Sequence, residues 1–74
     1  MEKYLIYYNE SADSKKFVYN VGRTSNSHST DVGDAIEFDN KETALRVRDY
    51  INSRDGVTKY RVMCIKTTTE EVTG

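Results

Sequence analysis

Three stretches of the chain carry the short apolar runs that are typical of strands, and a fourth has the period of a helix. Residues 3–8, 16–21 and 57–66 are rich in aromatic and β-branched side chains and are short enough to be strands. The turn formers in residues 9–14 predict that the first two strands form a hairpin. Residues 35–38 are a brief apolar piece, either a short strand or an extended lead-in to the helix.

The helix follows directly after residue 40. Asp39 or Asn40 can cap its first turn, and Asp39 with Glu42 has the spacing of a capping box. Gly56 is placed to end the helix. The apolar stripe at 100° per residue consists of Ala44, Val47 and Ile51, flanked by Leu45 and Tyr50.

This order of elements predicts an α+β fold. One helix packed on one face of a three- or four-stranded, mainly antiparallel sheet is the simplest architecture for it. The length of 74 residues allows a single domain with a thin core, which we assign to residues 1–66. We expect residues 67–74 to form a flexible tail and the Ser/Thr-rich residues 23–33 to form a mobile surface loop.

Both faces of the predicted sheet are apolar, because side chains alternate along a strand. Tyr4, Ile6 and Tyr8 share one face, whereas Leu5 and Tyr7 share the other. Since one helix covers one face, the second face would be an interface for a partner or a second copy of the chain. The alternatives are that tyrosine hydroxyls make this face tolerably wet or that the long loop covers it. The candidate partner-binding aromatic residues are Tyr4, Tyr7, Tyr8 and Tyr19.

Charge divides the chain into two parts, although the net charge is only −1. Residues 31–42 are acidic, and this edge could imitate a phosphate backbone and dock on the basic groove of a nucleic-acid enzyme. Its candidate partner-binding residues are Asp31, Asp34 and Glu37. Alternatively, these carboxylates only solvate a loop and serve the start of the helix. Residues 46–66 are basic, which with the aromatic residues leaves direct nucleic-acid binding as a less favoured reading.

The chain carries no recognisable catalytic, metal or cofactor motif. Its single histidine, His28, stands in the Ser/Thr-rich loop and reads as a solvated residue rather than a general base. The single cysteine, Cys64, lies in an apolar run and is expected to be buried as a small hydrophobe. No apolar run approaches the roughly 20 residues that span a bilayer, and residues 1–3 lack the pattern of a signal peptide. We therefore expect a cytoplasmic protein that is not an enzyme.

One segment resembles a known group of proteins. Residues 34–44, Asp-Ala-Ile-Glu-Phe-Asp-Asn-Lys-Glu-Thr-Ala, are similar to the D-A-x-x-F-x-x-x-E-x-A segment of small β-hairpin–helix–strand proteins from phages and prophages of Gram-positive bacteria. The resemblance implies the fold and a phage context. It also implies a bacterial host protein as partner, since anti-CRISPR proteins are the best-known class that the chain looks like.

The sequence leads to the hypothesis of a non-enzymatic phage or prophage protein that blocks or modulates a host protein, such as an anti-CRISPR or other anti-defence inhibitor. A small nucleic-acid-binding module and a homodimeric accessory protein without an inhibitory role are the alternatives.

Overall fold

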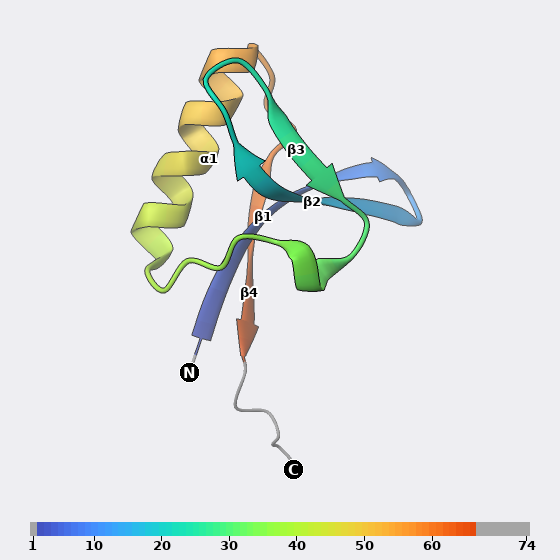
Figure 1. Cartoon of the computed structure of the whole chain (residues 1–74), viewed down its shortest axis with the longest axis vertical. Coiled ribbons are helices and arrows are strands. Elements are labelled where there is room, and N and C mark those ends of the chain that lie inside the picture. Colours follow the sequence, from blue (N-terminus) through green and yellow to red (C-terminus); the bar gives the residue numbers. More distant parts are fainter. Residues whose placement is uncertain (1, 67–74) are drawn as a thin grey trace.

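The structure, a computed structural model, describes residues 2–66 as a four-stranded antiparallel sheet with one α-helix (Figure 1). The strands lie in the order β3-β2-β1-β4. The elements are β1 (Glu2–Ser11), β2 (Ser14–Val21), β3 (Asn26–Ser29), the short 3₁₀ helix η1 (Val32–Asp34), α1 (Lys41–Asp55) and β4 (Arg61–Lys66). This confirms the predicted α+β fold with one helix. The predicted tail, residues 67–74, lies outside the described residues.

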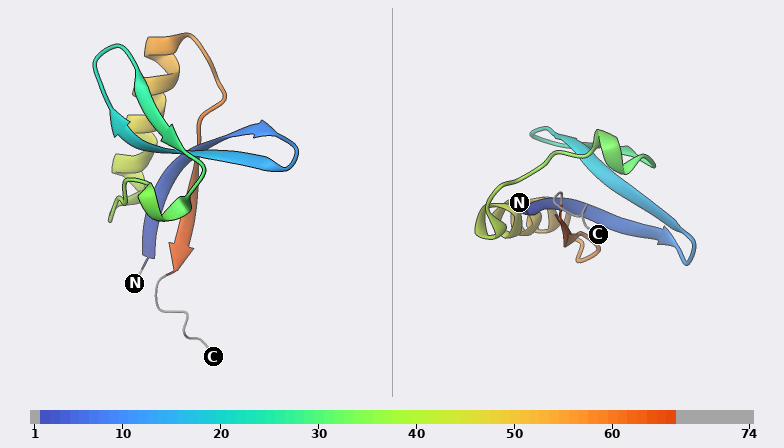
Figure 2. Two further views of the ribbon diagram at one scale, coloured as in Figure 1. Left: turned by 45° about the vertical axis from the view of Figure 1, so that its right-hand side comes forward. Right: turned by 90° about the horizontal axis from the view of Figure 1, so that it is seen from below.

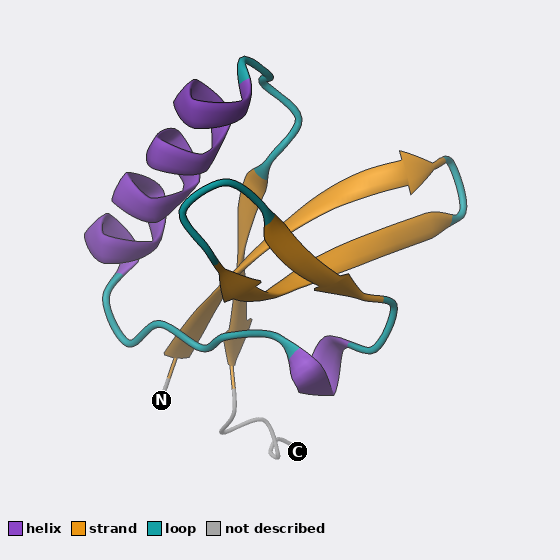
Figure 3. Cartoon of the chain, turned by 45° about the horizontal axis from the view of Figure 1, so that its top comes forward, coloured by secondary structure: helices purple, strands orange, loops and turns teal. Residues whose placement is uncertain are grey.

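Strand β1 is central, and its two halves have different partners. Residues 2–7 pair with β4, whereas residues 7–11 pair with β2. The β1–β2 hairpin therefore projects away from the helix, as Figure 3 shows. Its turn consists of Ala12 and Asp13 alone, so both strands are longer than the sequence predicted.

The lead-in to the helix fills the gap that opens where β2 diverges from the first half of β1. Phe38 and Tyr4 exchange two backbone hydrogen bonds, of 2.9 and 2.8 Å, and the Ile36 amide donates to the Val18 carbonyl at 3.1 Å. This isolated bridge is the extended lead-in that the sequence left open as one alternative. It also fixes the direction of the Tyr4 backbone groups, which matters for the site below.

Helix α1 begins and ends near the predicted residues. The Asn40 side chain accepts hydrogen bonds from the Glu42 and Thr43 amides, so Asn40 is the N-cap. The capping box built on Asp39 is wrong, because the Asp39 carboxylate instead forms an ion pair with Lys3. Gly56 ends the helix at a φ of 66°, a left-handed conformation that favours glycine.

The core has two parts, one on each face of the sheet. On the helix side, Ile6, Val18 and Ile51 are almost fully buried together with Tyr60. On the other side, Leu5 and Phe17 are buried with Ala35. The segment before the helix thus packs over the second face, as the view from below in Figure 2 shows. Tyr7, Met63 and Ile65 remain only partly buried at its margin.

Residues 23–33 are more ordered than the sequence predicted. Asn26–Ser29 form the edge strand β3, and Val32–Asp34 form η1. The prediction of a continuous mobile loop is wrong because tertiary contacts outweigh the polar composition of this segment. Its polar side chains find hydrogen-bond partners inside the domain.

The last strand is shorter than predicted and begins at Arg61. Before it, Tyr60 is anchored by Asn52 of α1: the Tyr60 amide donates to Asn52 Oδ1 at 3.1 Å, and Asn52 Nδ2 donates to the Tyr60 carbonyl at 3.3 Å. The side-chain amide therefore takes the place of a neighbouring strand.

Candidate functional site

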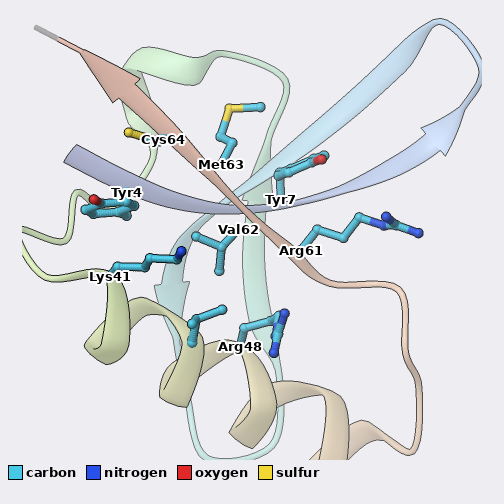
Figure 4. A pocket seen from close by; sticks show the side chains of 9 residues that line it. Tyr4, Tyr7, Lys41, Arg48, Arg61, Val62, Met63 and Cys64 are labelled. Carbon is cyan, nitrogen blue, oxygen red and sulfur yellow. The ribbon is translucent and has the colours of Figure 1, made fainter. Parts of the chain in front are cut away.

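A surface concavity of about 530 Å³ lies between α1 and the edge strand β4 (Figure 4). We call it the β4 groove. Tyr4, Tyr7, Lys41, Leu45, Arg48 and the β4 residues Arg61 to Cys64 line it.

The helical wall of the β4 groove is formed by Lys41, Leu45 and Arg48. Spacings of four and three residues place these side chains on one face of a helix. This face is distinct from the buried stripe of Ala44 and Ile51. Leu45 therefore presents a partly exposed apolar surface between two basic side chains.

The strand wall of the β4 groove is an open sheet edge. In an antiparallel pair, the backbone groups of a residue point either toward its partner or away from it, and the direction alternates along the strand. Tyr4 directs its amide and carbonyl to Phe38, away from its β4 partner Cys64. Cys64 must then direct its own amide and carbonyl outward, and so must Val62, two residues earlier.

These outward groups have no hydrogen-bond partner among residues 2–66. Because β4 ends the strand order, no described strand lies beyond it. Neither the Val62 backbone nor the Cys64 backbone takes part in any of the hydrogen bonds that connect the described elements outside the β1–β4 pairing. The edge thus offers two amide–carbonyl pairs to an incoming chain.

The charge of the β4 groove is positive. Within the described part of the chain, Lys41 and Arg61 form no ion pair, whereas Arg48 lies 2.6 Å from the Asp49 carboxylate. Figure 4 shows Lys41 near the Cys64 end of β4 and Arg48 nearer to Arg61. Positive charge therefore stands at both ends of the groove.

Tyr4 closes one end of the groove. Its hydroxyl donates to Glu2 Oε1 at 3.0 Å, and this hydrogen bond raises the pKa of Tyr4 above its usual value. The same hydrogen bond holds the Glu2 carboxylate beside the Tyr4 end of the groove.

A second concavity, of about 350 Å³, lies on the other side of α1. We call it the Tyr50 cleft. Its lining is almost entirely apolar and consists of Val21, Ile36, Phe38, Arg46, Val47 and Tyr50. Tyr50 itself is 52% exposed.

The aromatic rings nearest to β3 form a closed cluster. The His28 ring stacks on Tyr60 at a centroid distance of 6.0 Å and meets the edge of Tyr8 at 5.2 Å. His28 Nε2 also lies 2.9 Å from the Tyr60 hydroxyl. Burial, followed by the charges of Lys59 and Lys16, lowers the pKa of His28. His28 is therefore a neutral, packed residue and not the solvated one that the sequence predicted.

The structure separates the four candidate tyrosines. Tyr4 and Tyr7 line the β4 groove. Tyr8 packs against His28 and Tyr60, with the Lys59 ammonium 4.3 Å from its ring centroid. Tyr19, 47% exposed, lies on β2. These residues do not form a single aromatic surface.

The three candidate carboxylates lie on the segment between β3 and α1. Asp31 Oδ1 accepts a hydrogen bond from the Gly33 amide at 2.9 Å, and Asp34 Oδ2 accepts one from the Ser29 hydroxyl at 2.8 Å. Both carboxylates therefore stabilise the η1 turn. Glu37 is exposed and makes no side-chain hydrogen bond or ion pair with the described residues.

Sequence reasoning missed Lys41, Leu45 and the open edge of β4. The predicted basic stretch 46–66 did contain Arg48 and Arg61. A second helical stripe at 41, 45 and 48 could have been recognised from the spacing. The expectation that Cys64 is buried is wrong: it is exposed, because α1 passes beside β4 without covering its outer edge.

The comparisons with known proteins add no relative. No protein-family model matches the chain, and neither the curated proteins nor the solved structures contain a match. The resemblance to phage accessory proteins therefore stays a prediction. Within residues 2–66, no helix is long and apolar enough to cross a membrane, and no three His, Cys, Asp or Glu side chains gather as a metal site would require.

Proposed function

We propose that this protein is a non-enzymatic binding protein that blocks or modulates another protein. The observation that supports it best is the open edge of β4, where Val62 and Cys64 direct backbone groups toward solvent beside a groove. An unpaired strand edge is a template for pairing with another chain. The resemblance to phage accessory proteins makes a bacterial host protein the expected partner and an anti-defence role the expected consequence.

A nucleic-acid partner is the second candidate, because Lys41 and Arg61 would also attract phosphates. Two features favour a protein. Alternating amides and carbonyls are complemented by another peptide backbone. In addition, Tyr8 and Tyr60 pack against each other and His28, so they do not offer the free ring faces on which bases stack.

The acidic segment remains a separate hypothesis for the same function. Glu37 is its most available carboxylate, since Asp31 and Asp34 hold the η1 turn. A partner with a basic groove would dock there, whereas a partner of the β4 groove would meet positive charge. Single charge reversals distinguish the two surfaces.

The test is capture by the immobilised chain from a lysate of a Gram-positive host, followed by reconstitution with the purified captured protein. We expect a defined complex whose affinity falls by at least about fivefold in Arg61→Glu, because like charges are brought together. Glu37→Lys is the matched control and leaves the affinity unchanged if the β4 groove is the interface.

Three results would contradict the proposal. One is that no captured protein re-forms a complex when purified. Another is a covalent change in the captured protein, which would indicate an enzyme. The third is binding of labelled single-stranded DNA or RNA tighter than about 10⁻⁶ M at physiological salt, which would favour the nucleic-acid module.

A further inference from the structure

We propose that the β4 groove takes an acidic, extended segment of the partner, which adds to β4 as a fifth strand. This inference rests on the proposed function and specifies the chemistry of the partner.

The spacing of the outward backbone groups of β4 determines which residues of an added strand can form hydrogen bonds with it. Val62 and Cys64 each present one amide and one carbonyl outward, and they are separated by roughly 6.7 Å, at about 3.3–3.4 Å per residue. Every second residue of an extended segment can therefore form a pair of hydrogen bonds with this edge. A helical segment cannot pair in this way, because its backbone amides and carbonyls form hydrogen bonds with one another.

The helical wall sets the side chains of the added strand. Leu45 lies between Lys41 and Arg48 on the wall of α1, and the two basic residues are about 10 Å apart along the helix axis, at 1.5 Å per residue. An apolar side chain facing Leu45, with an acidic side chain two residues before and two residues after it, matches this order. The acidic side chain at the Arg48 end would compete with Asp49 for Arg48. The expected motif is acidic–x–apolar–x–acidic.

The charge of the groove disfavours a second copy of this chain as the occupant. Two copies that paired through β4 would bring the same basic walls together, including Arg61 and Lys41 of both. Like charges that are brought together at an interface disfavour association. A homodimer through this edge is therefore an outcome that the test can detect rather than the expected one.

The decisive variant is Cys64→Pro. The Cys64 amide points away from β1, so proline removes a donor from the outer edge and leaves the β1–β4 hydrogen bonds intact. Cys64→Ala is the matched control, because it changes the same side chain but keeps the amide. Thermal melts of both variants should match that of the original chain.

The probe is a displayed library of random peptides long enough to span β4, selected on the full chain at physiological salt. We expect the selected peptides to carry the acidic–x–apolar–x–acidic motif. Cys64→Pro should weaken the binding of a labelled synthetic copy by about tenfold or more, as the loss of one hydrogen bond implies. Cys64→Ala should leave the binding unchanged, and Lys41→Glu should weaken it.

N-methylated copies of the selected peptide provide a second test that does not depend on the folding of Cys64→Pro. In an added strand, every second amide faces β4 and the amides between them face away. Methylation of the amides that face β4 should abolish binding, whereas methylation of the amides that face away should leave binding unchanged. Binding that survives methylation of each set of amides in turn would overturn the inference. So would peptides without acidic enrichment, peptides that map to the Tyr50 cleft, or a selection that yields no binder.

The two proposals fail separately. If a purified host partner binds the Cys64→Pro variant as tightly as the original chain, strand addition is wrong and the binding function stands. If peptides bind as expected but no host protein re-forms a complex, the proposed function fails and the groove remains a peptide site. Self-association in light scattering that Cys64→Pro abolishes would assign the edge to a second copy and overturn the inference.

Discussion

The surroundings of Tyr60 and the β4 groove differ in whether their polar groups have hydrogen-bond or ion-pair partners. Around Tyr60, almost every donor and acceptor is used: its hydroxyl meets His28 and Asn26, and its backbone meets Asn52. Arg54 extends this network to the Gly22 carbonyl at 2.6 Å. In the β4 groove, by contrast, the outward backbone groups of β4 and two cationic side chains have no partner among the described residues.

This difference separates the part of the domain that maintains the fold from the part that is free to bind. Buried polar groups stabilise a fold only when they are satisfied, and the Tyr60 cluster meets that condition. Polar groups at an exposed edge are hydrated and can exchange water for a partner at little net cost. We expect substitutions to affect stability at the cluster and binding at the groove.

The largest effect should come from removing the centre of the closed cluster. Tyr60 is 3% exposed, so Tyr60→Ala leaves a cavity and should lower the free energy of unfolding by about 3–5 kcal/mol. A domain of this size has roughly 4–11 kcal/mol in total, so the variant loses a large part of its stability. Urea denaturation followed by circular dichroism measures the loss.

Two controls separate packing from hydrogen bonding at this position. Tyr60→Phe keeps the ring but removes the hydroxyl that contacts His28 and Asn26, and it should cost about 1 kcal/mol. Tyr19→Ala removes a ring of the same size from an exposed site and should change stability by less than about 0.5 kcal/mol. Equal losses for Tyr60→Ala and Tyr19→Ala would mean that the cluster around Tyr60 contributes no more packing energy than an exposed site.

A smaller effect should appear in the amide hydrogen exchange of β4. The amides of Met63 and Ile65 face β1 and should exchange about a hundredfold more slowly than those of Val62 and Cys64, which face outward. Exchange measured by NMR at low protein concentration resolves this alternation. Slow exchange at Cys64 would mean that something already covers the edge, and the groove would not be open.

The elements of the fold could be predicted because their signals are local. The stripe of Ala44 and Ile51, with Gly56 after it, identifies the helix from a single segment. The opposite faces of Ile6 and Leu5 follow from the alternation of the strand. Both depend on residues that are close in the sequence, so no knowledge of the tertiary structure is needed.

The candidate site could be predicted only in part because it depends on strand register. Whether Cys64 directs its amide inward or outward is decided by the bridge between Tyr4 and Phe38, which are 34 residues apart. The packing of His28 could not be predicted from the sequence for a similar reason. Nothing near it in the sequence indicates that Tyr8 and Tyr60 enclose its ring.

The smallest effect concerns pH and tests whether the cluster around His28 is closed. Burial among Tyr8 and Tyr60, with the nearby charges of Lys59 and Lys16, lowers the pKa of His28 in the folded protein, although Asp55 opposes this shift. The unfolded chain keeps the ordinary value near 6.5 and therefore takes up the proton first on acidification. The contribution of the neutral His28 ring to the free energy of unfolding should be fully present above pH 6.5. It should decline as the pH falls toward the lower folded-state pKa, and the loss should level off below that pKa.

Urea denaturation at a series of pH values, with His28→Gln as the control, measures this decline. The control should be less stable at neutral pH but should lack the step below pH 6.5. The pKa of Asp55, lowered chiefly by its hydrogen bond with Arg54, causes a separate loss that begins only as the pH falls toward 3.8, so the two windows do not overlap near pH 6. If His28→Gln shows the same decline just below pH 6.5, another group titrates there and the His28 ring is not held neutral by the cluster.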